Sequence, residues 1–258
     1  MCRHLAYLGP ELKLGALILD PPHNLVEQAL NPREMRVGKV NVDGFGIGWF
    51  NPEGTPRRYR NSIPIWSDDN LPALAESLNG GHWIAMVRGA SPGLGVSQDN
   101  THPFMDDRWL FTLNGIIADF ATTLRGPIVE RIGTDNAAEI RGYTDAEYLF
   151  ALLRQFAREN PGADGVQLLA QLVDFLSHIA NDTQIALSIL LSEHDRLYAL
   201  RHSLNMSFPT LYYCENFNDG VAIASEPLHD RRHWKLMPEA SILTVDATQT
   251  LTLSSVDS

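Results

Sequence analysis

Met1-Cys-Arg-His-Leu-Ala-Tyr-Leu8 opens the chain, with a cysteine in second position and an apolar run close behind it. Residues 6–8 predict a strand that enters the core directly from Cys2. Methionine aminopeptidase removes Met1 when the next residue is small, so we expect Cys2 to carry a free α-amino group beside its thiol. An α-amino group has a pKa of roughly 8, so it can act as the base that activates this nucleophile. The alternative is an early cysteine whose only role is its place on the strand.

Alternating glycines mark the next strand. In Val-Asp-Gly-Phe-Gly-Ile-Gly-Trp-Phe, residues 42–50, the side chains of Phe45, Ile47 and Trp49 share one face. The three glycines leave the opposite face bare, which predicts that another backbone or a ligand comes close to it. A turn at residues 51–54 and a return strand from residue 57 predict a hairpin.

The remaining chain shows strands, then helices, then strands again. Helices are predicted at residues 12–19, 70–78, 144–156 and 166–179; Gly80-Gly81 ends the second, and the capping box Thr144-Asp-Ala-Glu147 starts the third. Extended segments are predicted at residues 83–90, 109–114, 185–191, 196–201, 210–214, 221–224, 241–245 and 251–253. This order favours one α+β domain over residues 1–258, with two antiparallel sheets between helical layers.

Composition excludes several classes of function. The net charge of −11 argues against a nucleic-acid or anionic-membrane partner. Two cysteines, Cys2 and Cys214, provide neither a disulfide framework nor zinc-ligand spacing, and Cys214 reads as a buried, inert thiol. The pattern His229-Asp-Arg-Arg-His233 does not suit a metal, and no phosphate- or dinucleotide-binding loop is found, so we predict no metal and no cofactor. No signal segment or long apolar run is present, so a cytoplasmic location is expected.

Asn114-Gly115 lies at the end of the strand predicted over residues 109–114 and is a candidate oxyanion hole. A side-chain amide and an exposed backbone N–H at a strand end are a suitable pair of donors for the charge that develops when a thiol attacks an amide. The alternative is a simple hairpin turn, for which Asn-Gly is a strong signal.

Arg88 and Asp145 are candidates for holding a substrate. Arg88 ends an otherwise apolar strand, where it can either bind a carboxylate with two hydrogen bonds or pair with an acidic side chain. Asp145 lies in the first turn of a capped helix, which stabilises its charge, and it can receive an ammonium group. Together they would recognise a zwitterionic α-amino acid. His102, in a loop before Pro103, can be a base, a ligand or a structural hydrogen-bonding group.

The order of these motifs resembles the class II glutamine amidotransferases, which are N-terminal nucleophile hydrolases. The motifs are Cys2, Asp43-Gly-Phe-Gly46, Arg88-Gly-Ala-Ser91, Asn-Thr-His102-Pro-Phe104, Asn114-Gly115 and Thr144-Asp-Ala-Glu147. The resemblance implies a four-layer αββα sandwich. It also implies that Cys2 is the nucleophile and its own amino group the base, with Asn114 and Gly115 as the oxyanion hole. Arg88 would hold the substrate α-carboxylate and Asp145 its α-amino group, while Ser91 stands at a substrate-binding position where threonine is common.

Three stretches are similar to the stand-alone members of this family that act in ergothioneine biosynthesis: residues 1–8, residues 41–46 and Ala224-Ser-Glu-Pro227. This similarity implies hydrolysis of a γ-glutamyl thio-histidine conjugate through a thioester on Cys2. Because no second domain is seen to consume ammonia, the alternative is a glutaminase subunit that supplies a separate synthase. Leu113 stands where the family usually has histidine, which leaves a non-catalytic γ-glutamyl-binding protein as a third hypothesis. Selectivity is expected in surface loops at residues 23–36 or 205–209.

Overall fold

The structure, a computed structural model, describes residues 2–35, 38–90 and 95–256. A seven-stranded sheet has the strand order β11-β9-β10-β1-β4-β2-β3. Its neighbouring strands are all antiparallel. The strands are β1 (Arg3–Lys13), β2 (Phe45–Phe50), β3 (Pro56–Asn61), β4 (Asn79–Val87), β9 (Tyr212–Phe217), β10 (Gly220–Ala224) and β11 (Lys235–Leu236). The strand that follows Cys2 therefore lies in the middle of this sheet.

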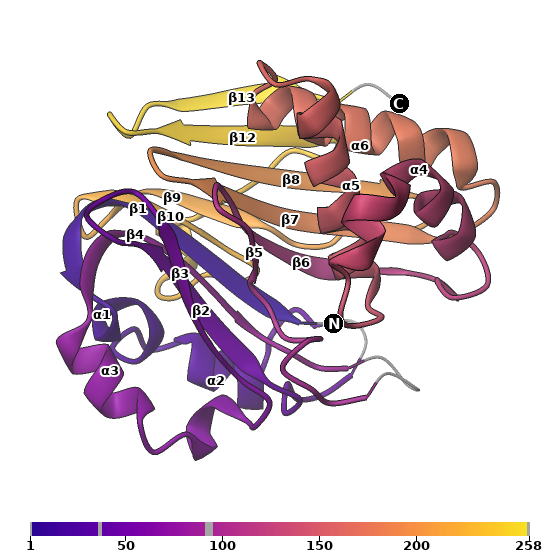
Figure 1. Ribbon diagram of the computed structural model, residues 1–258. Helices are drawn as coiled ribbons and strands as arrows, with labels where there is room; N and C mark the ends of the chain where they lie inside the picture. Colours follow the sequence, from indigo (N-terminus) through magenta and orange to yellow (C-terminus); the bar gives the residue numbers. More distant parts are fainter. Residues whose placement is uncertain (1, 36–37, 91–94, 257–258) are drawn as a thin grey trace.

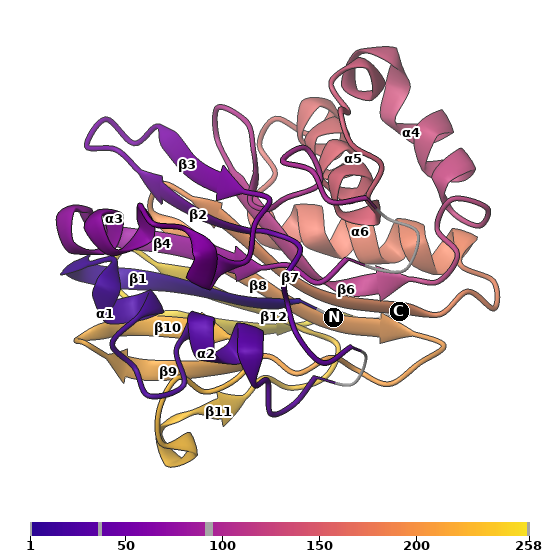
Figure 2. The same ribbon diagram turned by 90° about the horizontal axis from the view of Figure 1, so that it is seen from below.

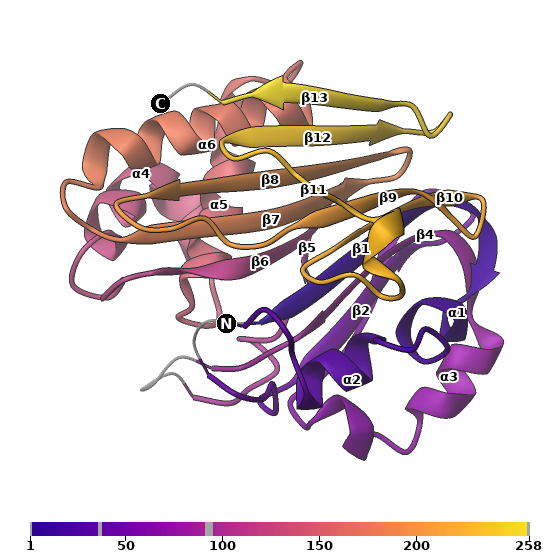
Figure 3. The same cartoon turned by 180° about the vertical axis from the view of Figure 1, so that it is seen from behind.

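A six-stranded sheet has the order β13-β12-β8-β7-β6-β5 and is also antiparallel throughout. Its strands are β5 (Phe104–Met105), β6 (Leu110–Ile117), β7 (Ile185–Glu193), β8 (Arg196–Leu204), β12 (Ser241–Asp246) and β13 (Leu251–Ser255). The two sheets stack face to face (Figures 1 and 3).

Helices cover both outer faces. The seven-stranded sheet is covered by α1 (Gly15–Ile18), α2 (Leu25–Leu30) and α3 (Leu71–Ser77), and the other sheet by α4 (Arg125–Ala138), α5 (Asp145–Glu159) and α6 (Gly165–Ile179), as Figure 2 shows. Two short 3-10 helices, η1 (Ile65–Ser67) and η2 (Arg231–His233), complete the described elements. The predicted α+β sandwich of two antiparallel sheets between helical layers is confirmed.

Strand β1 shows how the layers form. Successive side chains of a strand point to opposite faces. Leu5 and Tyr7 join the core under α1–α3, whereas Ala6 and Leu8 join the core between the sheets. Cys2 has the same parity as Ala6, so the chain enters the sandwich with its thiol on the side that faces the second sheet.

Gly46, the middle one of the three alternating glycines, has the predicted close neighbour. A Cβ atom built on Gly46 would lie 1.9 Å from the carbonyl oxygen of His102. On the other face of the same strand, Phe45 and Ile47 are buried under the helices. β2 and β3 form the predicted hairpin, which pairs Phe45 with Asn61 and Phe50 with Pro56.

Three local predictions are wrong. Residues 12 and 13 belong to β1, not to a helix. Gly80 and Gly81 do not end a helix but lie inside β4; a Cβ on Gly81 would lie 2.4 Å from the carbonyl oxygen of Gly9, so glycine serves a close approach of two backbones. The strand predicted to end at Asn114 continues to Ile117 and pairs Asn114 and Gly115 with β7, which excludes the alternative of a hairpin turn there.

Helix α5 begins as predicted, with a difference in detail. The Thr144 side chain accepts a hydrogen bond from the backbone N–H of Glu147, as an N-cap does. The Glu147 side chain does not return to Thr144; it accepts from the backbone N–H groups of Arg141 and Gly142 instead. The segment before α5 is thereby fixed to the helix that presents Asp145.

Candidate active site

One cavity of about 460 Å³ brings four of the predicted site residues together: Cys2, Arg88, Gly115 and Asp145 all line it. They come from the starts of β1 and α5, the end of β4 and the interior of β6. The start of β1 lies beside β6 (Figures 1 and 2). Asn114 is 1% exposed and does not line the cavity. Ser91 lies outside the described residues.

The thiol of Cys2 is partly buried at the cavity wall. Its Sγ donates a hydrogen bond to the carbonyl oxygen of Gly89 at 3.7 Å. Burial raises the pKa of the thiol above its usual value, although the nearby charges of Arg88 and Arg3 oppose that effect. A thiol in this environment needs a base to become a nucleophile, because the thiolate is the reactive form.

Arg88 is a buried cation that has no acidic partner among the described residues. The residue is 3% exposed, and within the described ranges its guanidinium donates to the carbonyl oxygens of Asp43 (3.3 Å) and Gly95 (3.4 Å). No ion pair of Arg88 is found among the described residues. Burying a charge without a counter-charge is costly, so this guanidinium is suited to receive an anion from the cavity. The alternative interpretation, in which Arg88 forms a salt bridge with an acidic side chain of the protein, is not supported by the described residues.

Asp145 is oriented by two backbone groups. Its Oδ2 accepts from the N–H of Ile117 at 3.1 Å and its Oδ1 from the N–H of Ala146 at 2.9 Å. Burial raises the pKa of this carboxyl, while both N–H groups and the charge of Arg88 act in the opposite direction. Each oxygen keeps a lone pair for a cation in the cavity.

Strand β6 has an open edge beside the cavity. β5 pairs only with Leu110 and Phe111, so no described strand pairs with the rest of β6 on that side. The N–H of Ile117 points there, since it reaches Asp145, whereas the N–H of Ala118 points the other way, to Gln184. Alternate N–H groups of a strand share a side. The N–H of Gly115 therefore points to the open edge, where the cavity lies.

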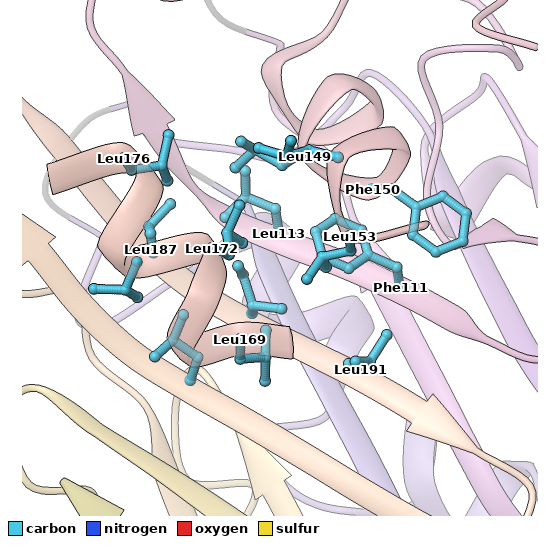
Figure 4. Close-up of a cluster of buried hydrophobic side chains, with 14 of the residues drawn as sticks. Phe111, Leu113, Leu149, Phe150, Leu153, Leu169, Leu172, Leu176, Leu187 and Leu191 are labelled. Atoms are coloured by element: carbon cyan, nitrogen blue, oxygen red, sulfur yellow. The ribbon is translucent and has the colours of Figure 1, made fainter. Parts of the chain in front are cut away.

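Asn114 and Leu113 point to opposite faces of β6. The Asn114 side chain lies between the sheets, where its Nδ2 donates to Ser225 Oγ at 3.1 Å. Leu113 is packed under α5 and α6 with Leu149 and Leu172 (Figure 4), and it also lines the cavity that contains Cys2. The hydrogen bond to the Asn114 amide therefore comes from Ser225, a residue of the Ala224-Ser-Glu-Pro227 stretch to which the sequence assigned no role.

The rest of the cavity wall is mostly apolar. Among the described residues that line the cavity, the charged ones are Asp43, Arg88 and Asp145. His102 also lines it, but burial and the charge of Arg88 lower its pKa well below the usual value, so its ring is neutral. Neither ring nitrogen of His102 has a hydrogen-bond partner among the described residues. This does not agree with the interpretation of His102 as a structural hydrogen-bonding group. The predicted selectivity loop at residues 205–209 contributes to the wall through Met206, Ser207 and Pro209.

Glu226 holds the start of β1 in place through an ion pair with Arg3. Its buried carboxylate accepts from the Arg3 guanidinium (3.1 Å), contacts His23 Nε2 (2.8 Å), and accepts from the N–H groups of Arg33 (2.8 Å) and Glu34 (3.0 Å). Burial raises the pKa of Glu226, but these partners outweigh burial and hold it below its usual value. Sequence reasoning missed this cluster because its members are far apart in the chain.

Within the described ranges, no group of three or more His, Cys, Asp or Glu side chains could hold a metal ion. No helix in the described part of the chain has the length and apolar character needed to cross a membrane. Cys214 is buried on β9, as predicted.

Comparison with known proteins agrees with this geometry. The family model described as "Glutamine amidotransferases class-II" matches residues 28–214. A protein named gamma-glutamyl-hercynylcysteine sulfoxide hydrolase from Mycolicibacterium smegmatis is 31% identical, over 95% of this chain and 96% of its own. A probable glutamine amidotransferase, DUG3 of Saccharomyces cerevisiae, is 27% identical over 95% of this chain and 82% of its own.

Solved structures give the same result. A glutamine aminotransferase class-II domain protein from Silicibacter pomeroyi has a TM-score of 0.75 and 26% identity, with both chains covered completely. Glutamine phosphoribosylpyrophosphate amidotransferase from Bacillus subtilis has a TM-score of 0.65 at 16% identity, over 99% of this chain and 49% of its own, and so shares the fold. With a matching family model over most of its length and relatives that align end to end, the chain belongs to the class II glutamine amidotransferase family.

Proposed function

We propose that the protein hydrolyses a γ-glutamyl amide bond through a thioester on Cys2, and that its substrate is a γ-glutamyl thio-histidine conjugate of the kind made in ergothioneine biosynthesis. The observation that carries the proposal is the single cavity lined by Cys2, Arg88, Gly115 and Asp145. The substrate class rests on the relatives named gamma-glutamyl-hercynylcysteine sulfoxide hydrolase, which are 31% identical over essentially the whole chain.

Arg88 and Asp145 hold the glutamyl end of the substrate in this proposal. The guanidinium binds the α-carboxylate and thereby gains the counter-charge that the described residues do not provide. The Asp145 carboxylate binds the α-ammonium group through the lone pairs left free by its two backbone donors. The two opposite charges fix the amino acid, and its side chain then carries the γ-carbonyl to Cys2.

The chemistry proceeds in two halves. The α-amino group of Cys2, freed by removal of Met1, takes the thiol proton as the sulfur attacks the γ-carbonyl carbon. The oxyanion receives N–H donors from Gly115 and from the Asn114 amide. The C–N bond then breaks, and the leaving amine takes the proton. Water attacks the thioester in the same way, which releases glutamate and restores the thiol.

The test is a panel of γ-glutamyl amides: glutamine, γ-glutamyl p-nitroanilide, simple γ-glutamyl-cysteine conjugates and γ-glutamyl-hercynylcysteine sulfoxide. Wild type should release glutamate fastest from the last, Cys2→Ala should release none, and mass spectrometry should show Met1 removed. Quantitative retention of Met1, or full activity of Cys2→Ala, would exclude the mechanism. Preference for free glutamine, with a synthase recovered by pull-down, would favour the glutaminase subunit; binding without turnover would favour a non-catalytic protein.

A further inference from the structure

The inter-sheet face beside Cys2 carries a buried network of polar side chains that the proposed chemistry does not yet use. Asn114, Ser188 and Ser225 are each at most 1% exposed, as are His4 and Thr112. The network joins β1, which carries the nucleophile, to β6, which carries the oxyanion donors. Buried polar groups are expensive unless they are hydrogen-bonded, so a connected set at this place has a defined geometry.

Ser225 is bonded to both strands at once. Its Oγ accepts from the backbone N–H of His4 and from Asn114 Nδ2, both at 3.1 Å. Its own N–H donates to the carbonyl oxygen of His4 at 2.9 Å. Thr210 Oγ1 donates to the Ser225 carbonyl oxygen at 3.0 Å, so the serine backbone is also held from the other side. Ser225 therefore stands at a fixed distance from the strand of Cys2.

The two hydrogen bonds that Ser225 Oγ accepts decide how Asn114 is oriented. A hydroxyl oxygen has two lone pairs, and a side-chain amide nitrogen has two hydrogens. One hydrogen of Asn114 Nδ2 is held by Ser225, which fixes the plane of the amide. The second hydrogen has no acceptor among the described residues, and it is the one that the proposed mechanism assigns to the oxyanion. Because Asn114 Oδ1 is buried without a described partner, Ser225 is what defines this orientation.

The His4 ring holds the same two sheets together. Its Nδ1 lies 3.0 Å from Thr112 Oγ1 on β6, and its Nε2 lies 3.0 Å from Ser188 Oγ on β7. Burial lowers the pKa of His4 to about 3, so the ring is neutral at physiological pH. Thr112 lies on the same face of β6 as Asn114, two residues earlier. The ring therefore fixes the spacing between β1 and β6 without adding charge near the thiol.

We infer that Ser225 is a positioning residue for the oxyanion hole, acting through Asn114, with the neutral His4 ring setting the sheet spacing that it needs. The inference rests on the proposed function, since it assumes that Cys2 attacks a carbonyl beside Asn114. It also accounts for Leu113: the orientation of the Asn114 amide comes from the opposite face of β6, so no side chain at position 113 has to supply it.

The experiment measures two reactions of Cys2 in Ser225→Ala. Acylation by γ-glutamyl p-nitroanilide, followed as the burst of p-nitroaniline, needs the oxyanion hole. Alkylation by iodoacetamide, followed by mass spectrometry of the Cys2 peptide, does not. Removing an oxyanion donor outright lowers kcat by about 10²–10³, so loosening one should slow acylation by roughly 10- to 100-fold, with KM and the alkylation rate unchanged. Ser225→Thr keeps the hydroxyl and should recover most of the acylation rate.

Ser192→Ala is the matched control. Ser192 lies on β7, is fully buried, and its hydroxyl has no described partner. This variant should acylate at the wild-type rate. If Ser225→Ala does not fold, Ser225→Cys serves instead, because it keeps the volume while a thiol is only a weak acceptor.

Two results would overturn the inference. One is an acylation rate in the Ser225 variant equal to that of Ser192→Ala. The other is a parallel loss of alkylation and acylation, which would show that the change acts on Cys2 or on the whole fold. Failure of the proposed function itself would look different, because either the wild type would show no acylation burst or Cys2→Ala would remain active.

Discussion

Asp145→Asn tests the binding of the substrate α-amino group. The aspartate has two carboxylate oxygens, and each already accepts one backbone N–H, from Ile117 and Ala146. Asparagine keeps one oxygen and the overall shape, but it presents an NH₂ group where the second oxygen stood. The substrate ammonium group then faces a neutral amide, or one backbone N–H loses its acceptor.

The expected loss can be estimated from that exchange. A hydrogen bond to a charged group contributes about 1.5–3 kcal/mol, and about 1.4 kcal/mol corresponds to a factor of ten. We therefore expect kcat/KM for γ-glutamyl p-nitroanilide to fall by roughly 10- to 150-fold, mainly through KM. The control substrate is glutaryl p-nitroanilide, which keeps the carboxylate for Arg88 but has no α-amino group. Wild type and Asp145→Asn should hydrolyse it at rates within about a factor of three.

The pH dependence gives an independent check. Burial raises the pKa of Asp145, so the ionised form that binds ammonium is lost at a higher pH than for an exposed aspartate. The advantage of wild type over Asp145→Asn should be full above that raised pKa and should shrink as pH falls through it. An equal loss on the glutaryl and γ-glutamyl substrates would refute the assignment, since it would show that the variant damages the site rather than one contact.

Three further variants test other parts of the structure. Arg88→Met should lower kcat/KM by about 100-fold or more while Tm is unchanged or raised, because a buried cation without an acidic partner contributes little to folding; differential scanning calorimetry and steady-state kinetics check both. Glu226→Gln should lower the free energy of unfolding by about 3 kcal/mol at pH 7. Its folded-state pKa is lowered, so wild type should lose this advantage as pH falls through that value, which urea titrations at several pH values will show. Gly46→Ala should destabilise by about 3 kcal/mol or more because its Cβ meets the His102 carbonyl; Gly126→Ala, which meets no atom within 4 Å, should not.

Local patterns predicted most of the architecture because local physics governs them. The alternation at residues 45–49 and the N-cap at Thr144 depend on neighbours within a few residues, and both are found in the structure. α4 was missed since its apolar spacing is irregular and Gly133, at φ 72°, interrupts it with a kink. β11 was missed because it is two residues long and depends on pairing with β9.

The candidate site divides in the same way. Cys2, Arg88 and Asp145 were found from their positions at the ends of elements, and the cavity brings them together. The strand was expected to end at Asn114 because Asn-Gly often ends a strand, but pairing with β7 carries β6 past both residues. Ser225 lies 111 residues from the Asn114 side chain that it holds, so no local pattern could connect the two.

The open edge of β6 also sets a length. Two residues of an antiparallel strand span about 6.8 Å. In the proposed mechanism, the N–H of Gly115 meets the oxyanion along that edge, and the N–H of Ile117 orients the Asp145 carboxylate that receives the ammonium group. The backbone of β6 thus sets the distance between the N–H groups of Gly115 and Ile117, and this distance does not depend on the identity of any side chain. An amide that is one methylene shorter than a γ-glutamyl group could then reach either the N–H of Gly115 or the Asp145 carboxylate, but not both at once.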